Sequence, residues 1–145
     1  RRPAVIVVDT NVIAYLWLRG DRTAHAEALL QRDPEWAAPL LWRSEFRNVL
    51  AGFLRRREID LDSAARIVSG AEDHLRGREF TPPSFAVLEL IQRSRCSAYD
   101  CEFVAVASDL GVPLVTSDKK ILAAFPTLAV ALDAAGKGPF RKPSK

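Results

Sequence analysis

The chain has 145 residues, of which 48% are hydrophobic and 27% are charged. This length and composition suit one globular domain and exclude a disordered or fibrous chain, and no apolar run approaches the roughly 18 residues that span a bilayer. The formal net charge is only +3. The basic run at residues 55–57 and the basic C-terminal end suit either a polyanionic partner or plain solvent, so charge does not decide the partner.

The N-terminal half alternates strand-like and helix-like patterns. A continuous apolar, β-branched run at 4–8 predicts a strand buried on both faces of a parallel sheet. Apolar periodicity and capping residues predict the elements that follow: a helix begun by Asp9-Thr10-Asn11 and ended near Gly20, a helix capped by Asp21 and reaching Gln31, a short strand at 35–38, and an amphipathic helix at about 41–56.

The C-terminal half continues the alternation. The predicted elements are a helix capped by Asp62 and reaching about Leu75, a strand at 78–81, a helix to about Arg95, a helix at 99–110 between Ser97 and Gly111, a strand at 113–116, a short helix at 118–125 and a last strand at 128–132. Alternating strands and helices predict an α/β fold with a mostly parallel sheet covered on both faces. Residues 1–133 are expected to form one domain, and residues 134–145 a basic, mobile tail.

The cysteines and the first residues of the chain bear on where in the cell the protein is expected. Cys96 and Cys101 lie five positions apart in a helical stretch, so we expect reduced thiols rather than a disulfide. Neither His25 nor His74 has the spacing of a zinc ligand. The opening residues lead directly into a strand pattern without the features of a signal peptide, and with the absence of a membrane span this predicts a cytoplasmic protein.

Two acidic residues are expected at the same edge of the sheet. Asp9 and Asp118 each follow a predicted strand, and ligands of parallel sheets bind beyond the carboxyl ends of the strands. Each residue is equally suited to cap the helix that comes next, and helix capping is the default explanation for either residue taken alone.

Two further acidic residues lie on the apolar stripes of predicted helices. Glu45 shares its face with Val49 and Phe53, and Asp100 shares its face with Phe103. Pairing with a nearby arginine would also explain Glu45, and the favourable electrostatics of a helix start would explain Asp100.

One shared cause explains all these acidic residues more economically than separate ones. Carboxylates buried together repel each other unless a cation or protons compensate them. Mg²⁺ or Mn²⁺ prefers such oxygen ligands and keeps several waters, one of which can attack a phosphodiester. The sequence therefore predicts a divalent-metal site for Asp9, Glu45, Asp100 and Asp118, with hydrolytic chemistry on phosphate.

The same residues resemble the PIN domain, and the similarity to toxin ribonucleases of the VapC type is close. The motifs run in order over residues 4–125: Val5-Ile6-Val7-Val8-Asp9-Thr10-Asn11, then Ser44-Glu45-Phe46-Arg47-Asn48, then Tyr99-Asp100 in a helix, and finally Leu114-Val115-Thr116-Ser117-Asp118.

The resemblance implies a three-layer α/β/α fold with a five-stranded, mostly parallel sheet. It implies a catalytic Mg²⁺ or Mn²⁺ site formed by Asp9, Glu45, Asp100 and Asp118, with Thr116 and Asn11 as supporting polar residues. It further implies cleavage of RNA, a homodimer, and a cognate antitoxin whose peptide covers an apolar groove and reaches toward the site.

Several alternatives stay open. Glu102 points roughly 200° around the helix from Asp100, so it is expected to be solvated or paired with a basic residue, although support of a metal site is possible. Ser117 could also assist. At the level of function, the alternatives are a housekeeping RNA-processing nuclease, a HAD-like phosphatase, which would want a second acid where Asn11 stands, and a non-catalytic RNA- or protein-binding module.

Overall fold

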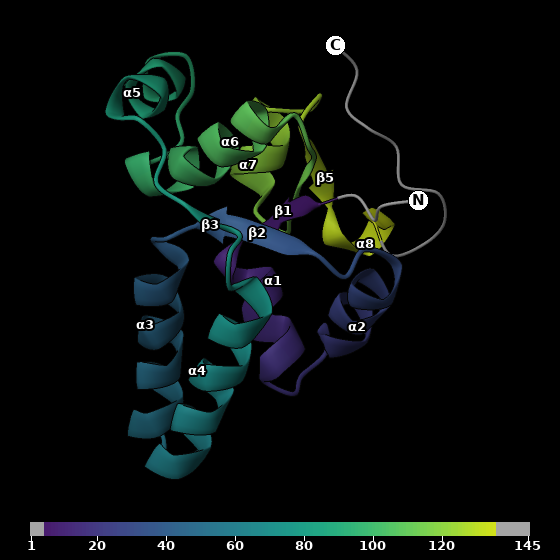
Figure 1. The fold of residues 1–145 in the computed structure, drawn as a ribbon, viewed down its shortest axis with the longest axis vertical. Coiled ribbons are helices and arrows are strands. Elements are labelled where there is room, and N and C mark those ends of the chain that lie inside the picture. Colours follow the sequence, from purple (N-terminus) through teal and green to yellow (C-terminus); the bar gives the residue numbers. More distant parts are fainter. Residues whose placement is uncertain (1–4, 136–145) are drawn as a thin grey trace.

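Five parallel strands in the order β3-β2-β1-β4-β5 form the centre of the protein, and helices cover both faces of this sheet (Figure 1). The computed structural model describes residues 5–135. The predicted α/β/α architecture is confirmed, and every strand pair is parallel. The strands are β1 (Ile6–Val8), β2 (Trp36–Pro39), β3 (Glu79–Phe80), β4 (Leu114–Thr116) and β5 (Ala129–Ala131).

The helices that connect β1 to β2 and β2 to β3 lie on one side of the sheet, and those that connect β3 to β4 and β4 to β5 lie on the other (Figure 1). In Figure 1, α5, α6 and α7 lie on one side of the sheet and α1, α2, α3 and α4 on the other. The bounds are α1 (Thr10–Trp17), α2 (Thr23–Arg32), α3 (Trp42–Arg55), α4 (Leu61–Leu75), α5 (Ser84–Gln92), α6 (Ala98–Leu110), α7 (Lys119–Ala124) and α8 (Leu132–Ala135).

The central strands form the core because both of their faces are covered. All three residues of β1 are buried, and so are all residues of β2 and β4. Val7 of β1 pairs with Ala37 on one side and Leu114 on the other. The strand at the start of the sequence is therefore a continuous apolar run because both of its faces are buried.

The order of the strands creates a crevice at one edge of the sheet. From β1 the chain builds β2 and β3 on one side, and it later builds β4 and β5 on the other. The connections that leave the carboxyl ends of β1 and β4 therefore diverge. Ligands of open parallel sheets bind at such a point.

Helix ends agree with the sequence prediction at some positions and differ at others. Gly111 ends α6 with a φ of 68°, as a left-handed C-cap. The predicted cap Asp62 is wrong, because α4 begins two residues earlier and Asp60 accepts the Ser63 N–H at 2.8 Å. The predicted cap Asp21 is also wrong, because α2 begins at Thr23 and Arg22 at its N-cap makes no side-chain cap. A capping side chain must stand directly before the first helical turn.

The C-terminal boundary falls within a short helix. The expected division between residues 133 and 134 lies inside α8. Residues 136–145, which hold most of the expected basic tail, lie outside the described residues. Over residues 5–135, no helix has both the length and the apolar character required to cross a membrane.

Candidate functional site

A cavity of about 410 Å³ opens beyond the ends of β1 and β4, and the acidic residues predicted from the sequence all line it. Asp9 directly follows β1, and Asp118 directly precedes α7. Glu45 and Asp100 lie in the first turns of α3 and α6. Four segments that are far apart in the sequence thus contribute one carboxylate each to the same cavity.

Asp9 is the most buried of these carboxylates, with an exposed fraction of 6%. Its Oδ1 accepts the Val12 N–H at 3.0 Å, and its Oδ2 accepts the hydroxyl of Thr116. Burial raises the pKa of Asp9 to about 6, although these hydrogen bonds oppose the shift, and the charge of Asp118 adds slightly to it. Asp9 caps α1, as its position after the strand predicted, and the capping role leaves it on the wall of the cavity.

Glu45 is held by a neighbour that the sequence reasoning did not select. Its Oε1 accepts the hydroxyl of Thr10 at 2.6 Å. Thr10 is buried and begins α1 directly after Asp9, so it lies between two of the carboxylates. Arginine pairing, the structural alternative for Glu45, does not occur among residues 5–135, where Arg43 and Arg47 pair with other acids. The only sign in the sequence that Thr10 belongs to the site was its position directly after Asp9.

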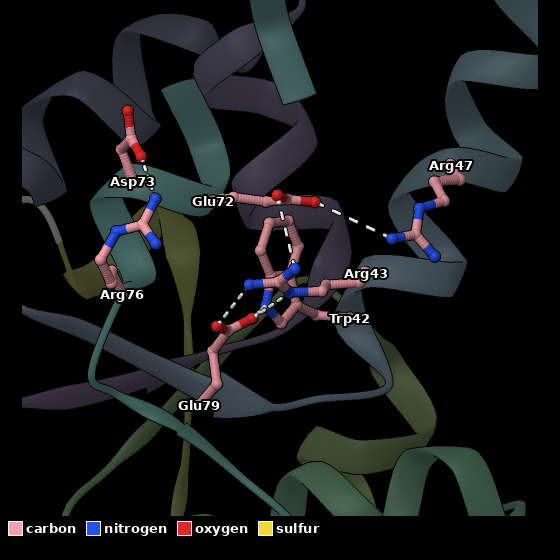
Figure 2. Close-up of polar contacts among 7 residues, drawn as sticks. All are labelled: Trp42, Arg43, Arg47, Glu72, Asp73, Arg76 and Glu79. Carbon is pink, nitrogen blue, oxygen red and sulfur yellow. Dashed lines mark hydrogen bonds and ion pairs between the residues drawn. The ribbon is translucent and has the colours of Figure 1, made fainter. Parts of the chain in front are cut away.

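A network of polar side chains anchors the start of α3 (Figure 2). Glu79 on β3 accepts the indole N–H of Trp42 at 2.7 Å. It also forms a bidentate ion pair with the Arg43 guanidinium, with hydrogen bonds of 2.7 and 2.8 Å. Glu72 on α4 lies 3.4 Å from Arg43 and 3.9 Å from Arg47. Because Glu45 follows within the same turn, this network fixes the position from which Glu45 enters the cavity.

Asp118 caps a helix and also lines the cavity. Its Oδ1 accepts the N–H groups of Lys120 and Ile121 at 2.8 and 3.3 Å. The Thr116 hydroxyl accepts the Asp118 N–H at 3.0 Å while it donates to Asp9. Thr116, which is fully buried, therefore couples the two strand-end carboxylates.

Asp100 is half-buried and stands one helical turn after the cap of α6. The Ser97 hydroxyl accepts the Asp100 N–H at 3.0 Å and so fixes the helix start that carries the carboxylate. Tyr99 beside it is 61% exposed at the cavity wall. The side chain of Asp100 has no ion pair or hydrogen bond with other described residues. It is the carboxylate with both oxygens available to a ligand.

Asn11, Ser117 and Glu102, whose roles the sequence left open, differ in their positions. Asn11 is exposed and lines the cavity, whereas Ser117 is bonded to the Tyr15 hydroxyl at 3.2 Å outside the wall. Glu102 was expected to be solvated or ion-paired; it makes no ion pair within residues 5–135, and its half-buried side chain keeps partial contact with solvent. Burial raises the pKa of Glu102, and the charge of Glu45 adds to this.

The donors around the cavity fit a hard cation better than a soft one. No histidine or cysteine lines the cavity. Cys96 and Cys101 are free and buried, and burial raises the pKa of both thiols. Over residues 5–135 no group of three or more acidic, histidine or cysteine side chains forms a ready-made metal shell. Oxygen donors that line a cavity without closing on one point suit an ion that keeps part of its water and completes its shell with substrate phosphate.

Comparisons with known proteins support the same fold. The family model described as "PIN domain" matches residues 6–126. The solved structure "Crystal structure of PAE2754 from Pyrobaculum aerophilum" is similar with a TM-score of 0.74 and 22% sequence identity, over 93% of this chain and 96% of that chain. At this identity the structural likeness supports the fold alone. A search of curated proteins finds no match.

Proposed function

The chain belongs to the PIN domain family, whose members are typically metal-dependent nucleases, and from this premise we propose that it is a Mg²⁺- or Mn²⁺-dependent endoribonuclease. The observation that carries the proposal is the convergence of Asp9, Glu45, Asp100 and Asp118 on one cavity at the crevice of the sheet. Helix capping explains Asp9 and Asp118, but it does not explain why Glu45 and Asp100 from two further helices line the same cavity. A divalent ion removes the repulsion among them.

The residues of this chain divide the work of the site. Asp9, Glu45, Asp100 and Asp118 would hold the ion, which when bound activates water and stabilises charge on the phosphate. Thr116 and Thr10 orient Asp9 and Glu45 by donating their hydroxyl hydrogens, and each carboxylate oxygen keeps a further lone pair for a ligand. Binding of a cation also keeps Asp9 ionised, because it opposes the burial that raises the pKa of this group.

Cleavage of single-stranded RNA by purified protein tests the proposal. We expect Mg²⁺ to support cleavage, EDTA to abolish it, and Asp100→Asn to reduce its rate by more than about 100-fold. The matched control is Glu89→Gln, which alters an exposed glutamate of α5 that lies at a different cavity and should cleave like the parent protein. Undiminished cleavage by folded Asp100→Asn would reject this site.

We further propose that the nuclease acts as the toxin of a toxin–antitoxin pair. The order and spacing of the motifs around Asp9, Glu45 and Asp100, which resemble VapC-type toxins, support this role. Expression in a bacterial host is expected to arrest growth, whereas Asp100→Asn should allow growth at equal protein level. Normal growth during expression of active nuclease would favour a housekeeping role in RNA processing instead.

The proposal includes a homodimer and a cognate antitoxin. Exposed apolar side chains on α5 support self-association, because Phe85 and Leu88 are 73% and 59% exposed on one short helix. Sedimentation of the purified chain should therefore give twice the mass of one chain, and Phe85→Ser with Leu88→Ser should give one chain mass. A monomeric parent protein at high concentration would reject the dimer.

A further inference from the structure

A second cavity, of about 400 Å³, adjoins the acidic one. Asn11 and Val49 lie in the walls of both cavities, so the two share a boundary formed by α1 and α3. The second cavity extends from this boundary toward the turn between α1 and α2. A polymer bound at the carboxylates could continue across this boundary into the second cavity.

The charges of this second cavity are distributed unevenly. Arg22 is committed to other groups, since it pairs with Asp133 at 3.1 Å and lies 5.7 Å from the centre of the Tyr15 ring. Arg19 is exposed and makes no ion pair or hydrogen bond through its side chain within residues 5–135. Asp21 is also exposed at the wall, yet it does not pair with Arg19. One guanidinium is therefore available to a bound anion.

The rest of the wall is aromatic and apolar. Tyr15 is half-buried, and its hydroxyl is bonded to Ser117 Oγ at 3.2 Å, which fixes its ring. Phe53 of α3 and Leu18, which directly follows α1, complete this side. A fixed aromatic surface beside a free guanidinium can bind both parts of a nucleotide, because bases stack on aromatic rings and phosphates accept hydrogen bonds from arginine.

We propose that this second cavity binds the nucleotide next to the scissile phosphate of a single-stranded RNA, with its phosphate on Arg19 and its base against Tyr15 and Phe53. The inference rests on the proposed nuclease function of the adjoining cavity. A polyanionic strand that enters a cavity lined by carboxylates is repelled by them, and Arg19 supplies opposite charge beside that path. The unpaired guanidinium of Arg19 favours binding of a phosphate-bearing strand over binding of a neutral peptide.

Binding of short oligouridylates to Asp100→Asn protein in Mg²⁺ tests this subsite without cleavage. Fluorescence anisotropy is measured for strands of two to six nucleotides with and without Arg19→Gln. We expect Arg19→Gln to weaken binding of the longer strands by about tenfold. We also expect the slope of log affinity against log salt to become shallower by about 0.7, the value for one phosphate contact on a single strand.

Arg93→Gln is the matched control. Arg93 is an exposed arginine at the end of α5, on the opposite side of the sheet, and it makes no ion pair within the described residues. We expect this variant to bind like its parent. Equal losses for both variants would indicate a general charge effect and overturn the proposal, as would unchanged affinity and salt slope for Arg19→Gln. Binding that depends on Arg19 in a protein that never cleaves RNA would reject the nuclease and leave the subsite standing.

Discussion

Asp9 makes hydrogen bonds that stabilise the fold, but its negative charge is unfavourable because the side chain is buried. It caps α1 and accepts the Thr116 hydroxyl, yet burial raises its pKa to about 6. A proton and a cation therefore compete for the same carboxylate near neutral pH. This competition makes the behaviour of the site dependent on pH in a direction that can be stated in advance.

The first prediction concerns Mn²⁺ affinity as a function of pH. Affinity should fall as the pH drops through about 6, because the protonated form of Asp9 does not bind a cation. Thr116→Val removes a hydrogen bond that lowers the pKa of Asp9, so the midpoint should move to higher pH. Titration calorimetry from pH 5 to pH 8 measures both. A midpoint near pH 4, or one unmoved by Thr116→Val, would contradict this explanation.

The second prediction concerns stability without metal. The pKa of Asp9 is raised from 3.8 to about 6 in the folded protein, so folding becomes less favourable as the pH rises from about 4 to about 6, and the cost is complete above that range. Asp9→Asn should therefore increase the free energy of unfolding at pH 8 by about 1 to 3 kcal/mol. Its benefit should be much smaller at pH 4.

Urea unfolding in EDTA at both pH values measures the effect. Asp118→Asn is the control, because Asp118 also caps a helix but is only half-buried, so its neutralisation should not give this gain. An Asp9→Asn protein that is less stable than its parent at pH 8 would show that the capping bonds outweigh the charge.

At the scale of elements, α1 and α4 approach each other at a glycine. A Cβ atom added to Gly70 of α4 would lie 2.5 Å from a ring carbon of Trp17, too close for any real contact. At Gly52 of α3, an added Cβ would meet only the flexible end of Arg56, at 3.0 Å. The two helical glycines therefore differ in what surrounds them.

The third prediction compares these two glycines. Gly70→Ala should lower the free energy of unfolding by about 1 to 3 kcal/mol, because the rigid indole must shift. Gly52→Ala should be neutral or raise it by up to about 1 kcal/mol, since alanine favours a helix. Chemical denaturation of both variants gives the comparison. Equal effects of the two substitutions would mean that α1 and α4 adjust without strain.

The fourth prediction concerns the anchor of α3. The Arg43 guanidinium lowers the pKa of Glu79, burial opposes this less strongly, and the Trp42 indole adds a further, smaller lowering. A group with a lowered pKa in the folded state stabilises the protein above its unfolded pKa, here 4.5, and this contribution is lost as the pH falls through the lower folded value.

Glu79→Gln should therefore cost about 1 to 3 kcal/mol at pH 7 and much less near pH 3. Unfolding followed by circular dichroism at both pH values measures this difference. Glu58→Gln is the control, because Glu58 pairs with Arg56 at a largely exposed site and should change stability little. A cost for Glu79→Gln that is the same at both pH values would show that shape, and not charge, anchors α3.

At the scale of the whole molecule, the sequence predicted most of the fold because its strongest patterns are local. The run ending at Asp9 reads as a buried strand, and α6 is bounded by Ser97 and Gly111 as expected. The cap of α4 was misplaced because Asp60 and Asp62 are both aspartates and lie two positions apart. The cap of α2 was misplaced because Arg22 at its N-cap makes no side-chain capping hydrogen bond that a sequence pattern could reveal. The short helix α8 carries no periodic signal of its own and was missed.

The sequence predicted the acidic residues of the site, but it did not predict the side chains that orient them. Apolar stripes and strand ends selected Asp9 and Glu45, since charged groups there contradict the pattern. The bond from Thr10 to Glu45 joins residues 35 positions apart and depends on the packing of α1 against α3. The same holds for Arg43 and Glu79, whose pairing requires β3 to lie beside β2. Such contacts follow from tertiary structure.

The anomalous signal of Mn²⁺ in crystals of this protein tests the central claim most directly. We predict a Mn²⁺ peak in the cavity lined by Asp9, Glu45, Asp100 and Asp118, with Asp100 among its ligands, and loss of that peak in Asp100→Asn crystals. A protein that cleaves RNA while Mn²⁺ binds elsewhere, or an empty cavity at saturating Mn²⁺, would contradict the account.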